Sequence, residues 1–109
     1  MRTYWEESHS ETIDGFEIVL FVTPEDMPPD WDETEEERAD TLRRIENGDL
    51  AYFVACVEAR REGITLGKTY LGGCCYDSVR QFVNASDYYG DMVEEAVNEA
   101  RTVIAKLNA

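Results

Sequence analysis

The stretch LAYFVACVEARREGITLGKTYLGGCCY, residues 50–76, predicts a long β-hairpin and with it the class of the fold. The two-residue alternation in Leu50–Arg61 places apolar side chains on both faces of a first strand. Glu62-Gly63 predicts the turn, and Ile64–Tyr76 is expected to return as a second long strand. Three glycines in that second strand indicate a bulge or a close approach of another backbone: Gly67, Gly72 and Gly73.

Another hairpin is expected earlier in the chain. Thr3–Ser8 predicts its first strand, and Phe16–Val22, which is almost continuously apolar, predicts its second. Asp14-Gly15 lies between them and is a strong signal for a tight hairpin turn. The apolar character of Phe16–Val22 is typical of a central strand or one that is well covered.

A helix is expected between the two hairpins. Three prolines (24, 28 and 29) end the preceding strand and predict an irregular link. The helix begins within Asp30–Thr34, where Thr34 and Glu37 have the spacing of a capping box, and it ends at Asn47-Gly48. Its apolar stripe is thin, so one side is expected to pack and the other to show carboxylates to solvent. The stripe consists of Ala39, Leu42 and Ile45, with Trp31 beneath it.

The C-terminal third predicts helices. Ser78–Asn84 is typical of a short helix, and Asp87 is a suitable N-cap for a last, longer one. Apolar residues of this last helix recur at steps of three and four: Tyr89, Met92, Val93, Ala96, Ala100, Val103, Ile104 and Leu107.

The expected fold is α+β and forms one domain over residues 1–109. Two hairpins give an antiparallel four-stranded sheet in the order β-β-α-β-β-α, with an additional short helix before the last. The helix after each hairpin is expected to pack on the same, apolar face of the sheet.

The charge is unusually negative and unevenly distributed. The chain has 24 Asp and Glu against 10 Lys and Arg, a formal net charge of −14. Residues 25–40 hold nine acids and one arginine, a net charge of −8. Nucleic acid and anionic membranes would repel such a chain, so we expect the protein to bind neither of them directly. Basic protein partners are the class that this charge favours.

The cellular compartment is expected to be the cytoplasm. The longest apolar run, Ile18–Val22, is too short for a membrane span, and the N-terminal segment lacks the layout of a signal peptide. The three cysteines (Cys56, Cys74 and Cys75) are an odd number with an adjacent pair, which is a poor disulfide framework. They are expected to be small buried side chains in a reducing cell.

Motifs for catalysis or cofactor binding do not occur in the sequence. No phosphate-binding loop, dinucleotide fingerprint, zinc-protease motif or nucleophile elbow is present, and no cofactor or metal is expected. Two weaker hypotheses stay open. Cys56, Cys74, Cys75 and His9 have the residue types but not the spacing of a zinc site. Cys74 or Cys75 with His9 as base would make a thiol enzyme.

The candidate binding site is therefore the acidic segment itself, with Trp31 as an apolar anchor within a charged rim. Two interpretations stay open: the segment imitates the charge of DNA, or it complements an ordinary basic patch. Both predict binding that weakens steeply with salt. The candidate partner-binding residues are Asp30, Trp31, Asp32, Glu33, Glu35, Glu36, Glu37 and Asp40.

The segment Tyr70–Ser78 (YLGGCCYDS), followed by Tyr88–Met92 (YYGDM), resembles small proteins carried by phages and mobile elements. Size, acidity and single-domain build are similar to the anti-restriction and anti-CRISPR proteins of those elements. The resemblance covers about residues 48–95 and implies a non-enzymatic inhibitor, active in the host cytoplasm, that binds a basic, nucleic-acid-handling defence complex. The alternative is a small homo-oligomeric assembly module whose acidity serves solubility. It would associate through the sheet face not covered by helices, at residues such as Tyr52 or Tyr70.

Overall fold

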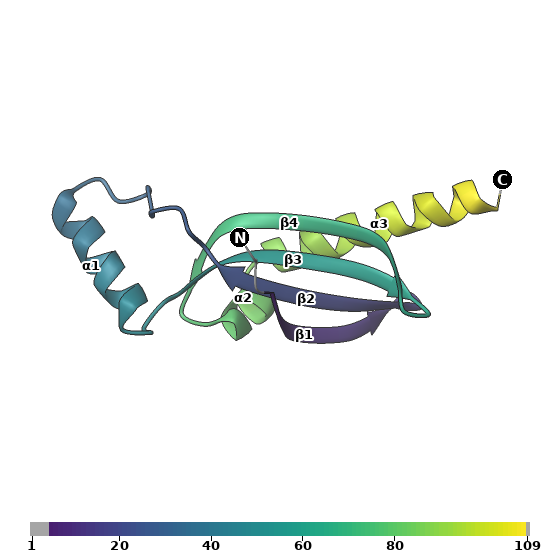
Figure 1. The fold of residues 1–109 in the computed structure, drawn as a ribbon, viewed down its shortest axis with the longest axis horizontal. Coiled ribbons are helices and arrows are strands. Elements are labelled where there is room, and N and C mark those ends of the chain that lie inside the picture. Colours follow the sequence, from purple (N-terminus) through teal and green to yellow (C-terminus); the bar gives the residue numbers. More distant parts are fainter. Residues whose placement is uncertain (1–4, 109) are drawn as a thin grey trace.

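The computed structural model describes residues 5–108 and shows an α+β fold with one four-stranded antiparallel sheet and three helices. The strands follow one another in the sheet in the order β1-β2-β3-β4, so β1 and β4 are the outer strands (Figure 1). The elements in chain order are β1 (Glu6–Ile13), β2 (Phe16–Pro24), α1 (Glu35–Glu46), β3 (Ala51–Arg61), β4 (Ile64–Tyr76), α2 (Val79–Ala85) and α3 (Tyr88–Leu107).

The element order is β-β-α-β-β-α-α, so the expected order β-β-α-β-β-α is only partly right. The additional short helix expected before the last one is present as α2, and Ser78 caps it by accepting from the N–H of Gln81 at 3.1 Å. The first expected strand, Thr3–Ser8, lies too early in the chain. β1 begins at Glu6 and continues to Ile13, while Thr3 and Tyr4 lie outside the described residues.

Both hairpin turns use the left-handed backbone that their sequences predict. Asp14 and Gly15 have φ of 53° and 81°, and Glu62 and Gly63 have φ of 52° and 78°. Two successive residues of this kind make a turn whose twist matches that of the flanking strands. These turns set the register of β1 with β2 and of β3 with β4.

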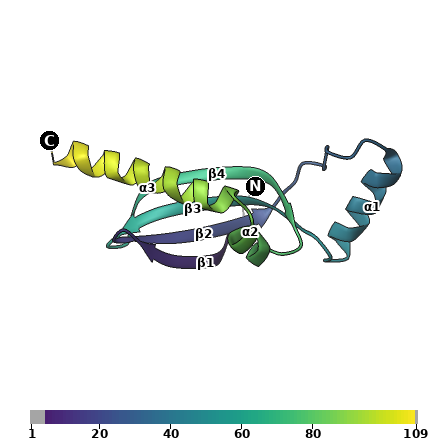
Figure 2. The same ribbon diagram turned by 180° about the vertical axis from the view of Figure 1, so that it is seen from behind.

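One face of the sheet is covered by α2 and α3, which lie behind the sheet in Figure 1 and in front of it in Figure 2. Alternate residues of β2 and β3 point toward these helices, and the facing residues of α3 lie at helical spacing. The buried core between sheet and helices includes Phe16, Ile18, Leu20, Phe53, Ala55, Val57, Phe82, Tyr89, Met92, Ala96 and Ala100.

Gly67 lets α3 lie directly on β4. A Cβ atom built at this position would lie 1.9 Å from the carbonyl oxygen of Ala96 and 3.0 Å from the nitrogen of Ala100. No side chain larger than hydrogen fits between the two backbones, which is the close approach that a glycine in a strand indicates. Gly67 therefore fixes where α3 crosses the sheet.

Gly72 and Gly73 form an irregularity in β4. The pairing of β3 with β4 shifts in register between Phe53 and Ala55, and Gly73 has a φ of 67°. The N–H of Gly73 donates to Glu25 Oε2 at 2.9 Å. The bulge is thus held by a carboxylate from the far end of β2, which ties β4 to the beginning of the segment that carries α1.

The expectation that α1 packs on the sheet is wrong. None of its residues is buried, and it stands beyond the end of the sheet, opposite to the end where α3 finishes (Figures 1 and 2). The helix begins at Glu35, one residue after the range Asp30–Thr34 that was predicted for its start. Thr34 caps it by accepting from the N–H of Glu37 at 3.1 Å. Glu37 in turn accepts from the N–H of Glu33 and not from that of Thr34, so the capping box forms only in part.

Candidate partner-binding site

Residues 25–50, which connect β2 to β3 and include α1, form a projecting segment that we call the acidic arm. It contains eleven acids and three arginines, a net charge of −8, or more than half of the −14 of the whole chain. A segment that packs loosely and carries like charges gains little from its own fold. The like charges of the arm therefore repel one another and do not stabilise the fold.

Contacts with β3 and β4 attach the first residues of the arm to the sheet. Tyr52 donates its hydroxyl hydrogen to the carbonyl oxygen of Met27 at 2.8 Å, and the Trp31 indole meets the Tyr52 ring edge-on at 5.5 Å between centroids. Glu25 accepts from Met27 N–H as well as from Gly73. These contacts fix the direction in which the arm leaves the sheet, while α1 itself stays free of the core.

The structure brings all eight predicted site residues onto the arm, but not onto one face of one helix. Residues 30–33 lie in the link before α1, and the remaining four lie on its first two turns. Because a helix turns about 100° per residue, consecutive side chains at 35–37 point in three directions. The arm therefore shows carboxylates around most of its circumference. Of the eight residues, only Asp32 is partly buried; the exposed ones are Asp30, Trp31, Glu33, Glu35, Glu36, Glu37 and Asp40.

Internal cations neutralise little of this charge. Among the described residues, the arm contains one ion pair, between Asp40 and Arg43 on α1. Both partners of that pair are largely exposed, so solvent screens it and it holds the arm only weakly. The carboxylates of residues 30–36 form no ion pair with any described cation.

Large apolar side chains are exposed among the carboxylates. Met27 is 70% exposed, Trp31 47% and Leu42 41%. Leu42 belongs to the stripe that was expected to pack on the sheet, and here it faces solvent. Aromatic and methionine side chains within a polar rim are typical of the centres of protein–protein interfaces. The arm thus combines a charge that attracts with apolar groups that would be buried on contact.

A groove separates the arm from the end of β4. Its volume is about 680 Å³, and six consecutive strand residues, Leu71–Tyr76, line one side of it. Trp31, Asp32 and Arg44 line the arm side, and Tyr88 at the start of α3 also lines the groove. Sequence patterns do not reveal this groove, because it depends on where the arm lies and not on the periodicity of any one element.

The opposite face of the sheet, which none of the described helices covers, carries an aromatic cluster. Its Tyr70 was expected there as a contact of the homo-oligomeric alternative, whereas its neighbour Trp5 was not anticipated. Trp5 precedes β1 and reaches Tyr70 on β4, with 6.0 Å between ring centroids. These two rings and Phe21 surround a pocket of about 150 Å³ above Cys56. We call this surface the open face. Its apolar centre is what an alternating strand pattern with apolar residues on both sides would predict.

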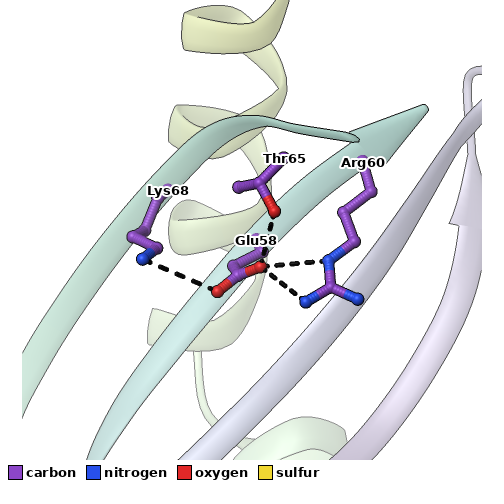
Figure 3. Close-up of polar contacts among 4 residues, drawn as sticks. All are labelled: Glu58, Arg60, Thr65 and Lys68. Atoms are coloured by element: carbon purple, nitrogen blue, oxygen red, sulfur yellow. Dashed lines mark hydrogen bonds and ion pairs between the residues drawn. The ribbon is translucent and has the colours of Figure 1, made fainter. Parts of the chain in front are cut away.

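The carboxylate of Glu58, on β3, is nearly buried beside this pocket of the open face (Figure 3). Oε1 of Glu58 accepts from Arg60 Nε at 3.0 Å and Nη2 at 2.8 Å and from the Thr65 hydroxyl at 2.9 Å, and Lys68 Nζ lies 3.7 Å from Oε2. Burial alone would raise the pKa of Glu58, but the hydrogen bonds from Arg60 and Thr65 outweigh it, so the pKa is lowered. The network satisfies the carboxylate internally and leaves it little capacity for an outside ligand.

The thiol-enzyme arrangement is not assembled. His9 lies on β1 and Cys74 and Cys75 on β4, the two outer strands, which places base and thiols at opposite edges of the sheet. Instead, Nε2 of His9 lies 2.9 Å from Oε2 of Glu11, and this oxygen also accepts a hydrogen bond from the Tyr89 hydroxyl at 2.7 Å. Burial raises the pKa of Cys74 to about 11, so its thiol stays protonated near neutral pH.

The zinc hypothesis likewise finds no assembled site. Within residues 5–108, no three His, Cys, Asp or Glu side chains come together as a group that would hold a metal ion. None of the helices in this part of the chain combines the length and the apolar character that crossing a membrane requires. Comparison of the chain with known protein families, with curated proteins and with solved structures finds no match. The function is therefore argued from the geometry and charge of the arm.

Proposed function

We propose that this protein is a non-enzymatic inhibitor that binds a basic, nucleic-acid-handling complex of a host defence system through the acidic arm. One observation carries the proposal: the arm places seven carboxylates within residues 30–40 outside the fold, none of them buried in the core. A surface that evolved to hold nucleic acid presents the complementary charge. The resemblance to anti-restriction and anti-CRISPR proteins supports the same class of partner.

The spacing of the carboxylates fits one strand of nucleic acid better than a duplex. Residues 30–34 precede the helix and span at most about 13 Å, and residues 34–40 add about 9 Å at the rise of an α-helix. Seven carboxylates over about 22 Å give one charge per 3 Å or so, close to the spacing of about 3.4 Å along a single strand. The arm would thus compete for phosphate contacts without imitating a double helix in full.

The proposal is tested by capture from a bacterial lysate with the tagged full-length chain. Wild type is compared with a reversal on the arm, Glu33→Lys, Glu36→Lys and Glu37→Lys. The control reverses three exposed carboxylates of α3, Glu94, Glu95 and Glu99, and changes the net charge by the same amount. Quantitative mass spectrometry should show a nucleic-acid-handling complex that wild type and the α3 variant retain at low salt and the arm variant loses. Equal retention by the arm variant would refute the proposal.

A second candidate function, homo-oligomeric assembly, is favoured by the open face. Tyr70 is 57% exposed there beside Trp5, while the carboxylate between the strands is neutralised by its own network. Two chains of net charge −14 repel each other, so a dimer formed through this apolar face would not weaken as salt rises. Sedimentation of wild type and of Tyr70→Ala over a range of salt concentrations tests this candidate. A monomer at every salt concentration would refute it.

A further inference from the structure

The groove between the acidic arm and β4 contains a carboxylate oxygen that lacks a partner. Oδ2 of Asp32 is shielded from solvent and accepts no hydrogen bond from any of the described residues. Removing a carboxylate oxygen from water without a donor costs free energy, and most such groups in native proteins do have a partner. Asp32 lines the groove, so a turn of its side chain would expose the shielded oxygen to a donor brought in by another molecule, and that hydrogen bond would recover the cost.

The surroundings of Asp32 select a cationic and planar donor. Trp31 and Tyr88 line the same groove, and these residues are 47% and 57% exposed. Exposed aromatic rings beside a carboxylate suit a guanidinium group, which stacks on ring faces and donates in a fork that matches carboxylate geometry. The net charge of −8 on the arm adds a field that attracts a cation.

The outer strand sets the shape of what the groove accepts. Leu71–Tyr76 are consecutive residues of β4, and β4 is an edge strand with no neighbour on its outer side within the described part of the chain. An extended segment can lie along such an edge, with alternate side chains directed into the pockets beside it.

Among the described residues, Arg44 is the one cation that lines the groove. It forms no ion pair with Asp32 among the described residues, although both charges act on the Cys75 thiol. Burial is the main cause that raises the pKa of Cys75; Arg44 opposes this shift and Asp32 adds to it. Because Arg44 lines the same groove as Asp32, its charge opposes the entry of a cation, and it forms no ion pair that would satisfy Asp32.

We propose that this groove is the socket for an arginine side chain on an extended basic segment of the partner, with Asp32 as its acceptor. The inference rests on the proposed function and deepens it, because it assigns one contact within the complex that the arm forms. Two substitutions should then act in opposite directions. Asp32→Asn removes the acceptor charge and weakens binding, whereas Arg44→Ala removes the competing cation and strengthens it.

The probe is a fluorescein-labelled hexapeptide of alternating valine and arginine, compared with the same peptide carrying neutral citrulline in place of arginine. Anisotropy titrations with the full-length protein at low salt measure the dissociation constants. Asp32→Asn should raise the dissociation constant about tenfold or more, since it removes a charge-assisted pair. Arg44→Ala should lower it about twofold to fivefold, as expected for an exposed charge. The citrulline peptide should bind at least tenfold more weakly than the arginine peptide.

A structural role for Asp32 would give a different result. Its charge lacks a partner in the free protein, so Asp32→Asn should leave the urea midpoint equal to or above that of wild type. A lower midpoint together with weaker peptide binding would mean that Asp32 supports the fold, and it would overturn the inference. Titration of ¹⁵N-labelled wild type with the arginine peptide gives a second readout, the amide chemical shifts. The socket predicts shift changes at residues 71–76, whereas a purely structural role of Asp32 predicts none there.

The remaining outcomes separate this inference from the proposed function. Failure of the arginine peptide to bind wild type, or equal binding by Asp32→Asn, would overturn the socket. If the reversal of Glu33, Glu36 and Glu37 still abolished capture of the partner, the acidic arm would stand without it. If neither that reversal nor Asp32→Asn weakened binding, both proposals would fall.

Discussion

Replacement of Gly67 by alanine should separate α3 from the sheet. The new Cβ would lie 1.9 Å from the carbonyl oxygen of Ala96, whereas ordinary contact requires at least 3.4 Å. The two backbones must therefore move apart by about 1.5 Å, which loosens the packing of Ala96 and Ala100, both fully buried. Overpacking of this kind costs about 1–3 kcal/mol, and we expect about 3 kcal/mol because backbone meets backbone and no flexible side chain can move aside.

The assay is urea unfolding followed by circular dichroism. At a slope of about 1.5 kcal/mol per molar urea, the midpoint of Gly67→Ala should fall by about 2 M. Gly90→Ala is the matched control, because Gly90 lies in the first turn of α3 and its new Cβ would meet nothing within 4 Å. That control should gain about 0.5–1 kcal/mol from helix propensity. A midpoint for Gly67→Ala equal to that of wild type would refute the close approach of α3 and β4.

Three further predictions concern the arm, the β1–α3 contact and the cysteines. Thr34→Ala removes the cap of α1 at a cost of about 1 kcal/mol, so amide hydrogen exchange within residues 35–46 should accelerate about fivefold. Because no residue of α1 is buried, the urea midpoint of the whole protein should stay unchanged. A lower midpoint would contradict this. Hydrogen bonds from Tyr89 and His9 lower the pKa of Glu11, so its contribution to stability is present above its unfolded value of 4.5 and is lost as pH falls through the lower folded value. The melting temperature of Glu11→Gln should therefore be lower than that of wild type at pH 7, and this difference should disappear as the pH is lowered. A difference in melting temperature that stays constant with pH would contradict the linkage. Because burial raises the pKa of Cys74 to about 11, iodoacetamide at pH 8 should modify it much more slowly in the folded protein than in urea, as mass spectrometry can measure.

Local sequence signals predict those parts of the fold that depend on neighbouring residues. Asp14-Gly15 and Glu62-Gly63 place both turns, because few residue pairs accept two positive φ angles in succession. The spacing of apolar residues identifies α3, and the glycine in the middle of β4 marks the close approach of that helix. Each of these features is determined within a few residues of chain.

The position of the arm depends on contacts that local patterns do not contain. The stripe of Ala39, Leu42 and Ile45 led to the expectation that α1 packs on the sheet. A signal against this was present: Arg38 and Glu46 fall on the same side of the helix at 100° per residue and interrupt the stripe. The stripe is too narrow and too charged to offset the cost of burying its neighbours.

The candidate site was predictable as a composition but not as a geometry. Net charge identified seven of the eight arm residues, and Trp31 was added as an apolar anchor; the structure places all eight outside the core. The groove beside Asp32 and the contact of Trp5 with Tyr70 join residues that are about 40 and 65 positions apart in the sequence. Contacts at such separations arise from the order of strands in the sheet, which a single sequence specifies only through the whole fold.

The most direct test of the binding role of the arm is the salt dependence of the dissociation constant for the captured partner. It should be measured for wild type, for the arm variant reversed at Glu33, Glu36 and Glu37, and for the α3 variant reversed at Glu94, Glu95 and Glu99. If the arm makes the contact, wild type and the α3 variant should share one steep slope of log Kd against log salt, and the arm variant should bind weakly with a flat slope. The same slope and affinity for all three proteins would contradict the account, because the charge of the arm would then play no part in binding.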